Sequence, residues 1–233
     1  MEDYPRTALD IVFIFDGSIK IVPLNNFDID ISKYSLLGLF DKKYTVKYTN
    51  SIKAIHIRFK PNGIYPLTKI PLKHSWKSQV CLEDLIGGEI SNVYNNMGNE
   101  SDAATKINLL ESYLLKKYDE SRLHHKFDHC LDVIRKGNCK INVEQLAYAV
   151  NSNYKSLDRW FQKYVGTTPK KYLQLNRFKN VLQSIDNQSR IDWMQLVVDY
   201  GFHDQSHFIN HFKSIAGVTP TEYSVGQKPN LTS

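Results

Sequence analysis

A short stretch near the C-terminus carries hydrogen-bonding side chains where a helix would expose them. In "DQSHFINHF", residues 204–212, Phe208 and Phe212 lie four positions apart and would share the buried face of a helix. A helix that needs only solubility would carry lysine and glutamate outside, whereas glutamine, asparagine and histidine offer donors and acceptors that match base edges in the DNA major groove. The candidates for reading bases in this helix are Gln205, Ser206, His207 and Asn210.

A second stretch of the same character lies about fifty residues earlier. In "NYKSLDRWFQKY", residues 153–164, Asn153 can cap a helix whose buried face would hold Leu157 and Phe161, with Trp160 and Tyr164 beside them. The outer face again offers hydrogen-bonding groups, so the same chemistry is expected of it. The side chains left outside are Lys155, Ser156, Asp158, Arg159 and Gln162.

The two stretches belong to an internal repeat. Residues 146–172 align with residues 196–223 at an offset of 50 and, after one inserted residue, of 51. Each copy predicts a short helix, a tight turn at Asn151 or Gly201, and a second helix that ends near a glycine. Asparagine and glycine tolerate the left-handed backbone that such a turn needs. This is the pattern of a helix-turn-helix, whose second helix enters the major groove.

Between the copies, "TPKKYLQLNRFKNVLQSI", residues 168–185, predicts a connecting helix that starts at Pro169. Its 18 residues would span about 27 Å, close to the ~34 Å between successive major grooves on one side of a duplex. One chain can therefore place both second helices on the same DNA face. Basic side chains on or near the connector can contact phosphates, which position a protein without reading sequence. These candidates are Lys170, Lys171, Arg177 and Lys179.

The basic excess of the chain lies in this C-terminal part. The formal net charge is +6, and residues 121–233 hold 15 Lys+Arg against 9 Asp+Glu, which accounts for the whole excess. A basic half joined to a neutral half indicates that one part meets a polyanion, although an ordinary basic surface would give the same count. The three cysteines, Cys81, Cys130 and Cys139, are widely spaced and indicate reduced thiols. Because no apolar run of 18 residues and no signal peptide is found, we expect a cytoplasmic protein without a membrane partner.

The first 80 residues predict strands. Short β-rich runs alternate with turn residues: "DIVFIF" with "DGS", "IKIVPL" with "NN", "YTVKYT" with "NS", and "KAIHIRF" with "KPNG". This alternation predicts an antiparallel sheet or a small barrel. A break is expected at residues 95–102, where Ser101 or Asp102 can cap the helix that follows.

That helix, residues 103–118, closes the first half. Its apolar stripe can cover its own domain or form a homodimer contact, and the spacing leaves both alternatives open. The stripe consists of Ile107, Leu110, Leu114 and Tyr118, with Tyr113. The predicted organisation is a β-rich regulatory or sensor domain at 1–118, a polar linker at 119–127, a double helix-turn-helix domain at 128–224 and a tail at 225–233.

Residues from about 125 to 224 resemble the AraC/XylS family of bacterial transcription regulators. "GFHDQSHFINHFKSIAGVTPTEYS" is very close to the family signature around the second motif, and "LDRWFQKYVGTTPKKYLQLNRF" is similar to the first. The resemblance implies two helix-turn-helix units on a long helix, which bind asymmetric sites near promoters, most often as activators that contact RNA polymerase. Carried over by position, it names Lys155, Asp158 and Arg159 as base readers in the first copy and Gln205, Ser206, His207 and Asn210 in the second.

At Asn210 and Asp158 the expected contacts differ from those at the other base-reading candidates. Asn210 stands where the family often has arginine, so a weaker or different contact is expected there. Asp158 would repel phosphate and could accept a hydrogen bond from cytosine instead. The N-terminal segment "KAIHIRFKPNGIYPLTKIPL", residues 53–72, is similar to part of an uncharacterised β-rich, cupin-like sensor domain, but a first strand or two is lacking, which leaves open whether a ligand barrel closes.

Other side chains in the sequence are candidates for a ligand, metal or catalytic site. Arg58, Tyr65, His74 and Trp76, with Lys60, could line a pocket for an anionic small-molecule effector, or form an ordinary rim or domain interface. His203, His207 and His211 have metal-ligand spacing, but His203 falls in the turn and only Asp204 could complete the set. His125 and His129 have Asp128 and Cys130 beside them, but histidines of a linker are usually solvated, so no metal or cofactor is predicted. No nucleophile elbow, phosphate-binding glycine loop or zinc-protease motif occurs, so no enzyme activity is predicted.

The predicted fold is α+β: an N-terminal antiparallel β-rich domain followed by an all-α domain of two helix-turn-helix motifs joined by a long helix. The predicted function is that of a bacterial transcription factor, which binds double-stranded DNA sequence-specifically under the control of its N-terminal domain. The alternative is a ligand-binding or interaction protein whose helical domain binds DNA only nonspecifically.

Overall fold

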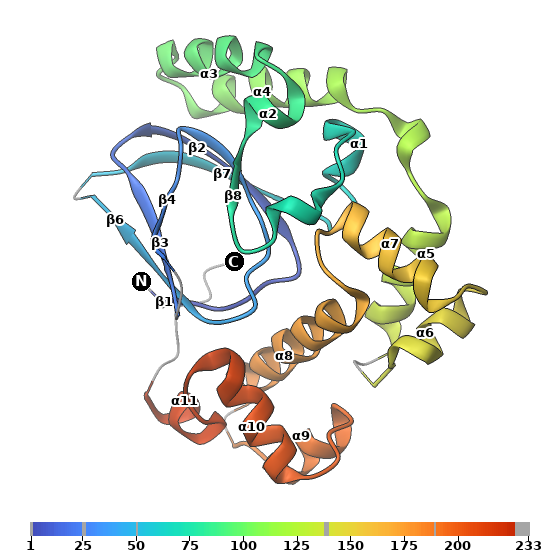
Figure 1. Cartoon of the computed structure of the whole chain (residues 1–233). Helices are drawn as coiled ribbons and strands as arrows, with labels where there is room; N and C mark the ends of the chain where they lie inside the picture. Colours follow the sequence, from blue (N-terminus) through green and yellow to red (C-terminus); the bar gives the residue numbers. More distant parts are fainter. Residues whose placement is uncertain (1, 25–26, 50, 138–139, 189, 227–233) are drawn as a thin grey trace.

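A computed structural model describes residues 2–24, 27–49, 51–137, 140–188 and 190–226. Figure 1 shows a β-rich half with helices above it, beside it and below it. The expected "NN" turn at Asn25 and Asn26, Cys139 and most of the predicted tail lie outside the described residues. Among the helices that the structure describes, none has the length and apolar content needed to cross a membrane.

Within these ranges, eight strands form two four-stranded antiparallel sheets. The orders are β1-β6-β3-β4 in one sheet and β7-β2-β5-β8 in the other. The strands are β1 (Glu2–Asp3), β2 (Leu9–Asp16), β3 (Ile19–Pro23), β4 (Ile29–Asp30), β5 (Tyr34–Leu37), β6 (Tyr44–Tyr48), β7 (Lys53–Phe59) and β8 (Gln79–Cys81). The prediction of an antiparallel β-rich N-terminal half is confirmed.

The turn residues mark corners between the sheets. The "DGS" turn joins β2 to β3, but β2 pairs with β5 and β7, whereas β3 pairs with β4 and β6. Gly17 in this turn has φ +77°, and a side chain there would collide with the carbonyl oxygen of Ser51. The chain therefore changes sheet at a position that only glycine fits.

Strand β2 is buried on both faces, which explains its continuous apolar run. Ile11 and Phe13 join the cluster that packs against the helices of this half, while Val12 and Ile14 face Ile21 of the other sheet. Each of these four side chains is at most 5% exposed. The second sheet is thus covered by the first sheet on one side and by helices on the other.

Of the five helical elements that the structure describes in the first half, only the last was predicted from the sequence pattern. They are α1 (Tyr65–Thr68), the short 3-10 helix η1 (Leu72–Ser75), α2 (Leu82–Ile86), α3 (Glu89–Asn99) and α4 (Ala103–Lys117). The expected break at residues 95–102 was therefore wrong in its first half, because α3 continues to Asn99. Ile90 and Met97 are fully buried, and this tertiary packing outweighs the poor helix propensity of asparagine and glycine.

Helix α4 begins where expected, with the Asp102 side chain accepting a hydrogen bond from the Thr105 amide at 2.7 Å. Its stripe is only partly buried. Leu110 and Tyr113 face the core, whereas Ile107 is 52% and Tyr118 is 40% exposed. Part of the stripe thus covers its own domain and part is exposed, so the two alternatives for this helix stay open.

The second half is helical to the last described residue. Its elements are η2 (Glu120–Arg122), α5 (His125–Lys136), α6 (Val143–Ala149), α7 (Tyr154–Tyr164), α8 (Pro169–Asn187), α9 (Trp193–Asp199), α10 (Gln205–Ala216) and α11 (Pro220–Gly226). The predicted domain limits stay predictions. The segment expected as a linker does contain structure, because α5 begins at His125 and Phe127 is completely buried.

Candidate nucleic-acid interface

The first repeat unit is α6, a turn and α7. Asn151 in the turn has φ +48°, the left-handed backbone expected there. Asn153 caps α7 by accepting a hydrogen bond from the Ser156 amide at 3.0 Å. The predicted buried stripe is confirmed, since Leu157 and Phe161 are 0% exposed. Outside the stripe, Lys155 and Arg159 are exposed, and Ser156, Asp158 and Gln162 are half-buried.

The Asn153 cap gives a stability prediction. Asn153→Ala removes the acceptor for an amide at the start of α7, and we expect a loss of about 1 kcal/mol in the free energy of unfolding. Urea denaturation followed by circular dichroism measures it. Asn153→Ser keeps a capping oxygen and is the matched control; equal losses in both variants would contradict the role of the cap.

The second unit is α9, a turn and α10. Gly201 has φ +65°, and Asp204 caps α10 through the His207 amide at 2.7 Å. Phe208 and Phe212 are each 1% exposed, which confirms the predicted buried face. The predicted outer side chains, Gln205, Ser206, His207 and Asn210, are all exposed.

Helix α8 joins the two units. Thr168 caps it and Pro169 is its first residue, as predicted. Its 19 residues correspond to about 28 Å. The predicted core positions are buried, so the helix is fixed against both units rather than free to bend. These positions are Tyr172, Leu175, Phe178 and Leu182.

The four phosphate candidates have different surroundings. Lys170 and Lys179 are exposed. The Lys171 ammonium lies 3.2 Å from the Asp41 carboxylate of the β-rich half, and the Arg177 guanidinium lies 5.3 Å from the centre of the Phe202 ring. Lys170 and Lys179 are therefore available to a polyanion as the protein stands, whereas Lys171 would have to exchange its partner.

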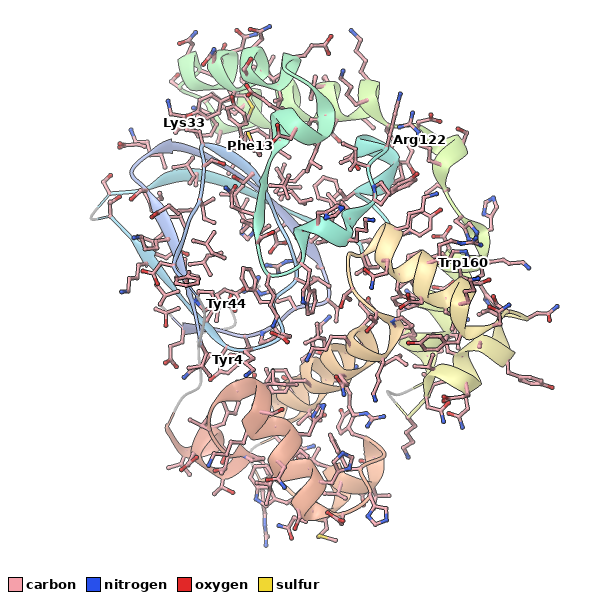
Figure 2. The ribbon with its side chains drawn as sticks, viewed as in Figure 1. Tyr4, Phe13, Lys33, Tyr44, Arg122 and Trp160 are labelled. Atoms are coloured by element: carbon pink, nitrogen blue, oxygen red, sulfur yellow. The ribbon has the colours of Figure 1, made fainter. Side chains whose placement is uncertain are left out.

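The β-rich half packs against both helix-turn-helix units. These contacts were not predicted from the sequence. Tyr4 is 6% exposed and packs in the core of the second unit, with its ring centre 5.5 Å from that of Tyr223 (Figure 2). The Lys43 amide donates to the Ile215 carbonyl at 2.8 Å. At the first unit, the Tyr65 ring meets Tyr164 edge-on at 4.9 Å. The mutual placement of the two units thus depends on the N-terminal half.

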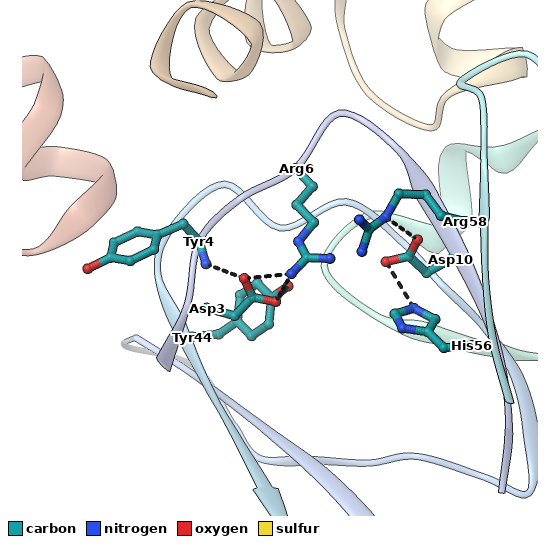
Figure 3. A network of polar contacts seen from close by, with 7 residues as sticks. All are labelled: Asp3, Tyr4, Arg6, Asp10, Tyr44, His56 and Arg58. Carbon is teal, nitrogen blue, oxygen red and sulfur yellow. Dashed lines mark hydrogen bonds and ion pairs between the residues drawn. The ribbon is translucent and has the colours of Figure 1, made fainter. Parts of the chain in front are cut away.

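The four residues predicted to line a ligand pocket have separate partners. The Arg58 Nε donates to Asp10, which also lies 3.1 Å from His56, next to the ion pair of Asp3 and Arg6 (Figure 3). Tyr65 is engaged with α7, His74 is exposed in η1, and the half-buried Trp76 has the Lys77 ammonium over its ring. A shared ligand role for Arg58, Tyr65, His74 and Trp76 stays a prediction.

One exposed residue of the first unit was missed. Tyr154 is the repeat equivalent of Gln205 at the offset of 51, and it is 57% exposed at the first position of α7. The signal was present in the repeat, since the position equivalent to a base-reading candidate is itself a candidate.

Two helix-turn-helix units with outward second helices, held by one connecting helix, define the class of a helix-turn-helix DNA-binding protein. Residues 146–225 match the family model described as a helix-turn-helix domain. A Haemophilus influenzae protein named as an uncharacterized HTH-type transcriptional regulator is 22% identical over 169 residues, covering 72% of this chain and 54% of the relative. The XylDLEGF operon transcriptional activator of Pseudomonas putida is 27% identical over 84 residues, covering 35% of this chain and 26% of the activator.

The chain thus spans about half the length of the first relative and about a quarter of the second. Among solved structures, ToxT from Vibrio cholerae is similar at 17% identity with a TM-score of 0.49, over 98% of this chain and 93% of ToxT. The match over residues 146–225 confirms the helix-turn-helix domain that the motifs predicted, and the likeness to the Pseudomonas activator over 84 residues agrees with the predicted resemblance to the AraC/XylS regulators.

Proposed function

We propose that the whole chain regulates transcription by reading an asymmetric DNA site with α7 and α10. The observation that carries the proposal is the repeated geometry: two capped helices expose hydrogen-bonding side chains and are fixed to one helix of about 28 Å. Because that length is close to the ~34 Å between successive major grooves, both helices can enter the same face of a duplex.

The residues proposed to contact bases are those of α7 and α10 whose outward side chains carry hydrogen-bonding groups. Arg159 and Asn210 occupy equivalent positions in the two units, and arginine suits guanine whereas asparagine suits adenine. Gln205, five residues before Asn210, offers the same pair of groups as asparagine. The remaining members of the proposed set are Lys155, Asp158, Ser206 and His207, with Tyr154 added from the repeat.

Lys170 and Lys179 supply phosphate contacts in this proposal, and Lys171 and Arg177 join them if their present partners are exchanged. Such contacts add affinity without sequence information, and salt weakens them. Regulation by the N-terminal half follows from its contacts with both units through Tyr4, Tyr65 and Asp41, because a ligand that favours one arrangement of the halves would shift the population that fits DNA.

Activation through contact with RNA polymerase is part of the proposal, supported by the likeness to an operon activator. Transcription in vitro from a promoter carrying the selected site tests it, with stimulation by the protein as the expected result. A homodimer through residues 103–118 remains a prediction. A strictly monomeric mass at micromolar concentration, with and without DNA, would contradict it.

The first experiment is selection from a random duplex library at about 150 mM salt, where nonspecific phosphate binding is weakened. We expect a motif with two blocks about one helical turn apart. Enrichment without a motif would favour the alternative function, in which the helical domain binds DNA only nonspecifically.

Single substitutions then test the reading residues. Arg159→Ala and Gln205→Ala are each expected to lower the ratio of specific to nonspecific affinity by about 5-fold to 150-fold, since a good bidentate base contact contributes about 1 to 3 kcal/mol of discrimination. Fluorescence anisotropy with the selected and a scrambled duplex measures the ratio.

Lys179→Ala is the matched control, because a phosphate contact should weaken binding to both duplexes equally and reduce the salt dependence. An unchanged ratio in both the Arg159 and the Gln205 variants would overturn the proposal.

A further inference from the structure

An apolar groove of about 670 Å³ lies where the first half of the chain meets the second. Its walls come from the edge strand β7, from α4 and from the segment that leads into α5. Figure 1 shows α1 and α4 on the same side of the sheets, with α5 following α4. None of the base-reading candidates belongs to this groove.

The groove is lined mainly by hydrocarbon. The half-buried Ile55, Ile57 and Phe59 of β7 face Leu110 and Leu114 of α4, and Leu123 adds a further apolar wall. The protein leaves several of the surrounding apolar side chains in contact with water, since Ile107 is 52% and Leu115 is 67% exposed. Contiguous exposed apolar surface of this kind marks binding sites more often than ordinary surface.

The formal charges of the four charged residues that line the groove sum to zero. Two are basic, Arg58 and Lys60, and two are acidic, Glu111 and Asp128. Arg58 is already paired with Asp10, and Asp128 accepts a hydrogen bond from Asn62. The remaining two, Lys60 and Glu111, carry opposite charges, so the lining has no net charge and the groove favours a molecule without a net charge.

The size favours a small molecule over a second copy of the chain. Ligand sites measure about 300 to 1,000 Å³, and the groove falls within that range. A stable protein interface covers about 800 Å² of each partner. A second copy of the chain on the outward side of α4 would also have to cover Asn108, Ser112 and Lys116, which are exposed polar residues among the exposed Ile107, Leu109 and Leu115.

We propose that this groove between β7 and α4 binds an uncharged, mainly apolar small molecule. Its position lets a bound molecule touch both halves, because Leu123 and Asp128 follow α4 and Asn62 ties the end of β7 to α5. Any effect of the ligand on DNA binding rests on the proposed function, whereas the binding itself does not.

The test uses N-phenyl-1-naphthylamine, a neutral apolar fluorophore, titrated into the full-length protein. We expect saturable fluorescence with one site per chain, and weaker binding of the anionic 1-anilinonaphthalene-8-sulfonate. Ile57→Trp fills the groove and should weaken binding of the neutral probe at least 10-fold. Val198→Trp places the same side chain on an exposed position of α9 and should leave binding unchanged.

Three results would overturn the proposal. One is equal probe binding by the protein and by Ile57→Trp, when both have native near-ultraviolet circular dichroism. Another is tighter binding of the anionic probe. The last is a dimer that excludes the probe at all concentrations, which would assign the groove to a second copy.

If Ile57→Trp does not fold, Leu114→Trp replaces it as the filling variant. Methyl NMR then locates the neutral probe, with shifts expected at Ile55, Ile57 and Leu110. Failure of the protein to select a DNA motif would sink the proposed function and leave these binding results standing.

Discussion

Gly166→Ala is expected to destabilise the protein by about 3 kcal/mol or more. Gly166 follows α7 with φ +83°, a conformation that costs other residues about 1 to 2 kcal/mol. In addition, a Cβ atom there would lie 2.3 Å from the Leu72 carbonyl oxygen and 3.0 Å from the Ser75 Oγ. Both neighbours are buried in η1, so the first helix-turn-helix would have to move away from the β-rich half.

The repeat supplies the matched control for this variant. Gly217 is the equivalent residue after α10, with φ +78°, but its added Cβ would meet only the side chains of Leu24 at 3.6 Å and Lys43 at 3.9 Å, which is ordinary contact. Gly217→Ala should therefore show the backbone cost of about 1 to 2 kcal/mol and nothing more. Guanidinium denaturation of both variants measures the difference in the free energy of unfolding. Equal losses would mean that η1 moves to accommodate the added methyl group, and that the contact between η1 and the first unit is not rigid.

The contrast between the two glycines shows how the halves are joined. The first unit meets the N-terminal half through close backbone approach at Gly166, and the second meets it through the buried ring of Tyr4. A ligand or substitution that loosens the β-rich half would release the second unit by withdrawing the Tyr4 ring and breaking the hydrogen bond from the Lys43 amide to the Ile215 carbonyl. Release of the first unit requires η1 itself to move.

The parts of the fold that sequence could predict are those set by neighbours in the chain. Asn153 was identified as a cap because a capping side chain bonds an amide three residues later. Likewise, Asn151 and Gly201 were identified as turn residues because left-handed backbone is a local property. The helical half consists largely of such elements, and its outline was confirmed.

The rest depends on contacts between distant segments. The turn residues do not determine that β2 pairs with β5 and β7. The strands of both sheets show the same alternation of β-rich runs and turn residues in the sequence. The burial of Tyr4 requires the N-terminal segment to reach Phe178, which lies 174 positions away. Helix α3 forms despite its asparagines because Met97 is buried in the hydrophobic core. The groove likewise exists only once β7 and α4 are side by side.

The stability of the second unit is expected to fall as pH decreases from about 6.5 to 4, because of His211. This side chain lies on α10, with its ring centre 5.4 Å from that of Phe202. Burial lowers the pKa of His211 to about 4, and the nearby charges of Arg177, His207 and Lys171 act in the same direction. The folded protein thus keeps the imidazole neutral, whereas the unfolded chain takes up a proton below its ordinary pKa of 6.5.

The sign follows from linkage: the unfolded state binds more protons between pH 6.5 and 4, so the free energy of unfolding decreases as pH falls through this window. A difference of about 2.5 pH units corresponds to roughly 3 kcal/mol as an upper limit, since the side chain is not fully enclosed. Above pH 6.5 the group contributes no pH dependence.

His211→Phe should remove most of this dependence, because phenylalanine keeps a ring against Phe202 and cannot be protonated. Urea denaturation at intervals between pH 7 and about 5.5 measures it, above the range in which ordinary carboxylates titrate. A residual slope is expected from His124, whose pKa burial also lowers. His129→Phe on the exposed face of α5 controls for replacing a surface histidine. If His211→Phe retains the full slope, the ring is hydrated and protonates freely, and α10 is packed less tightly against α8 than its contacts indicate.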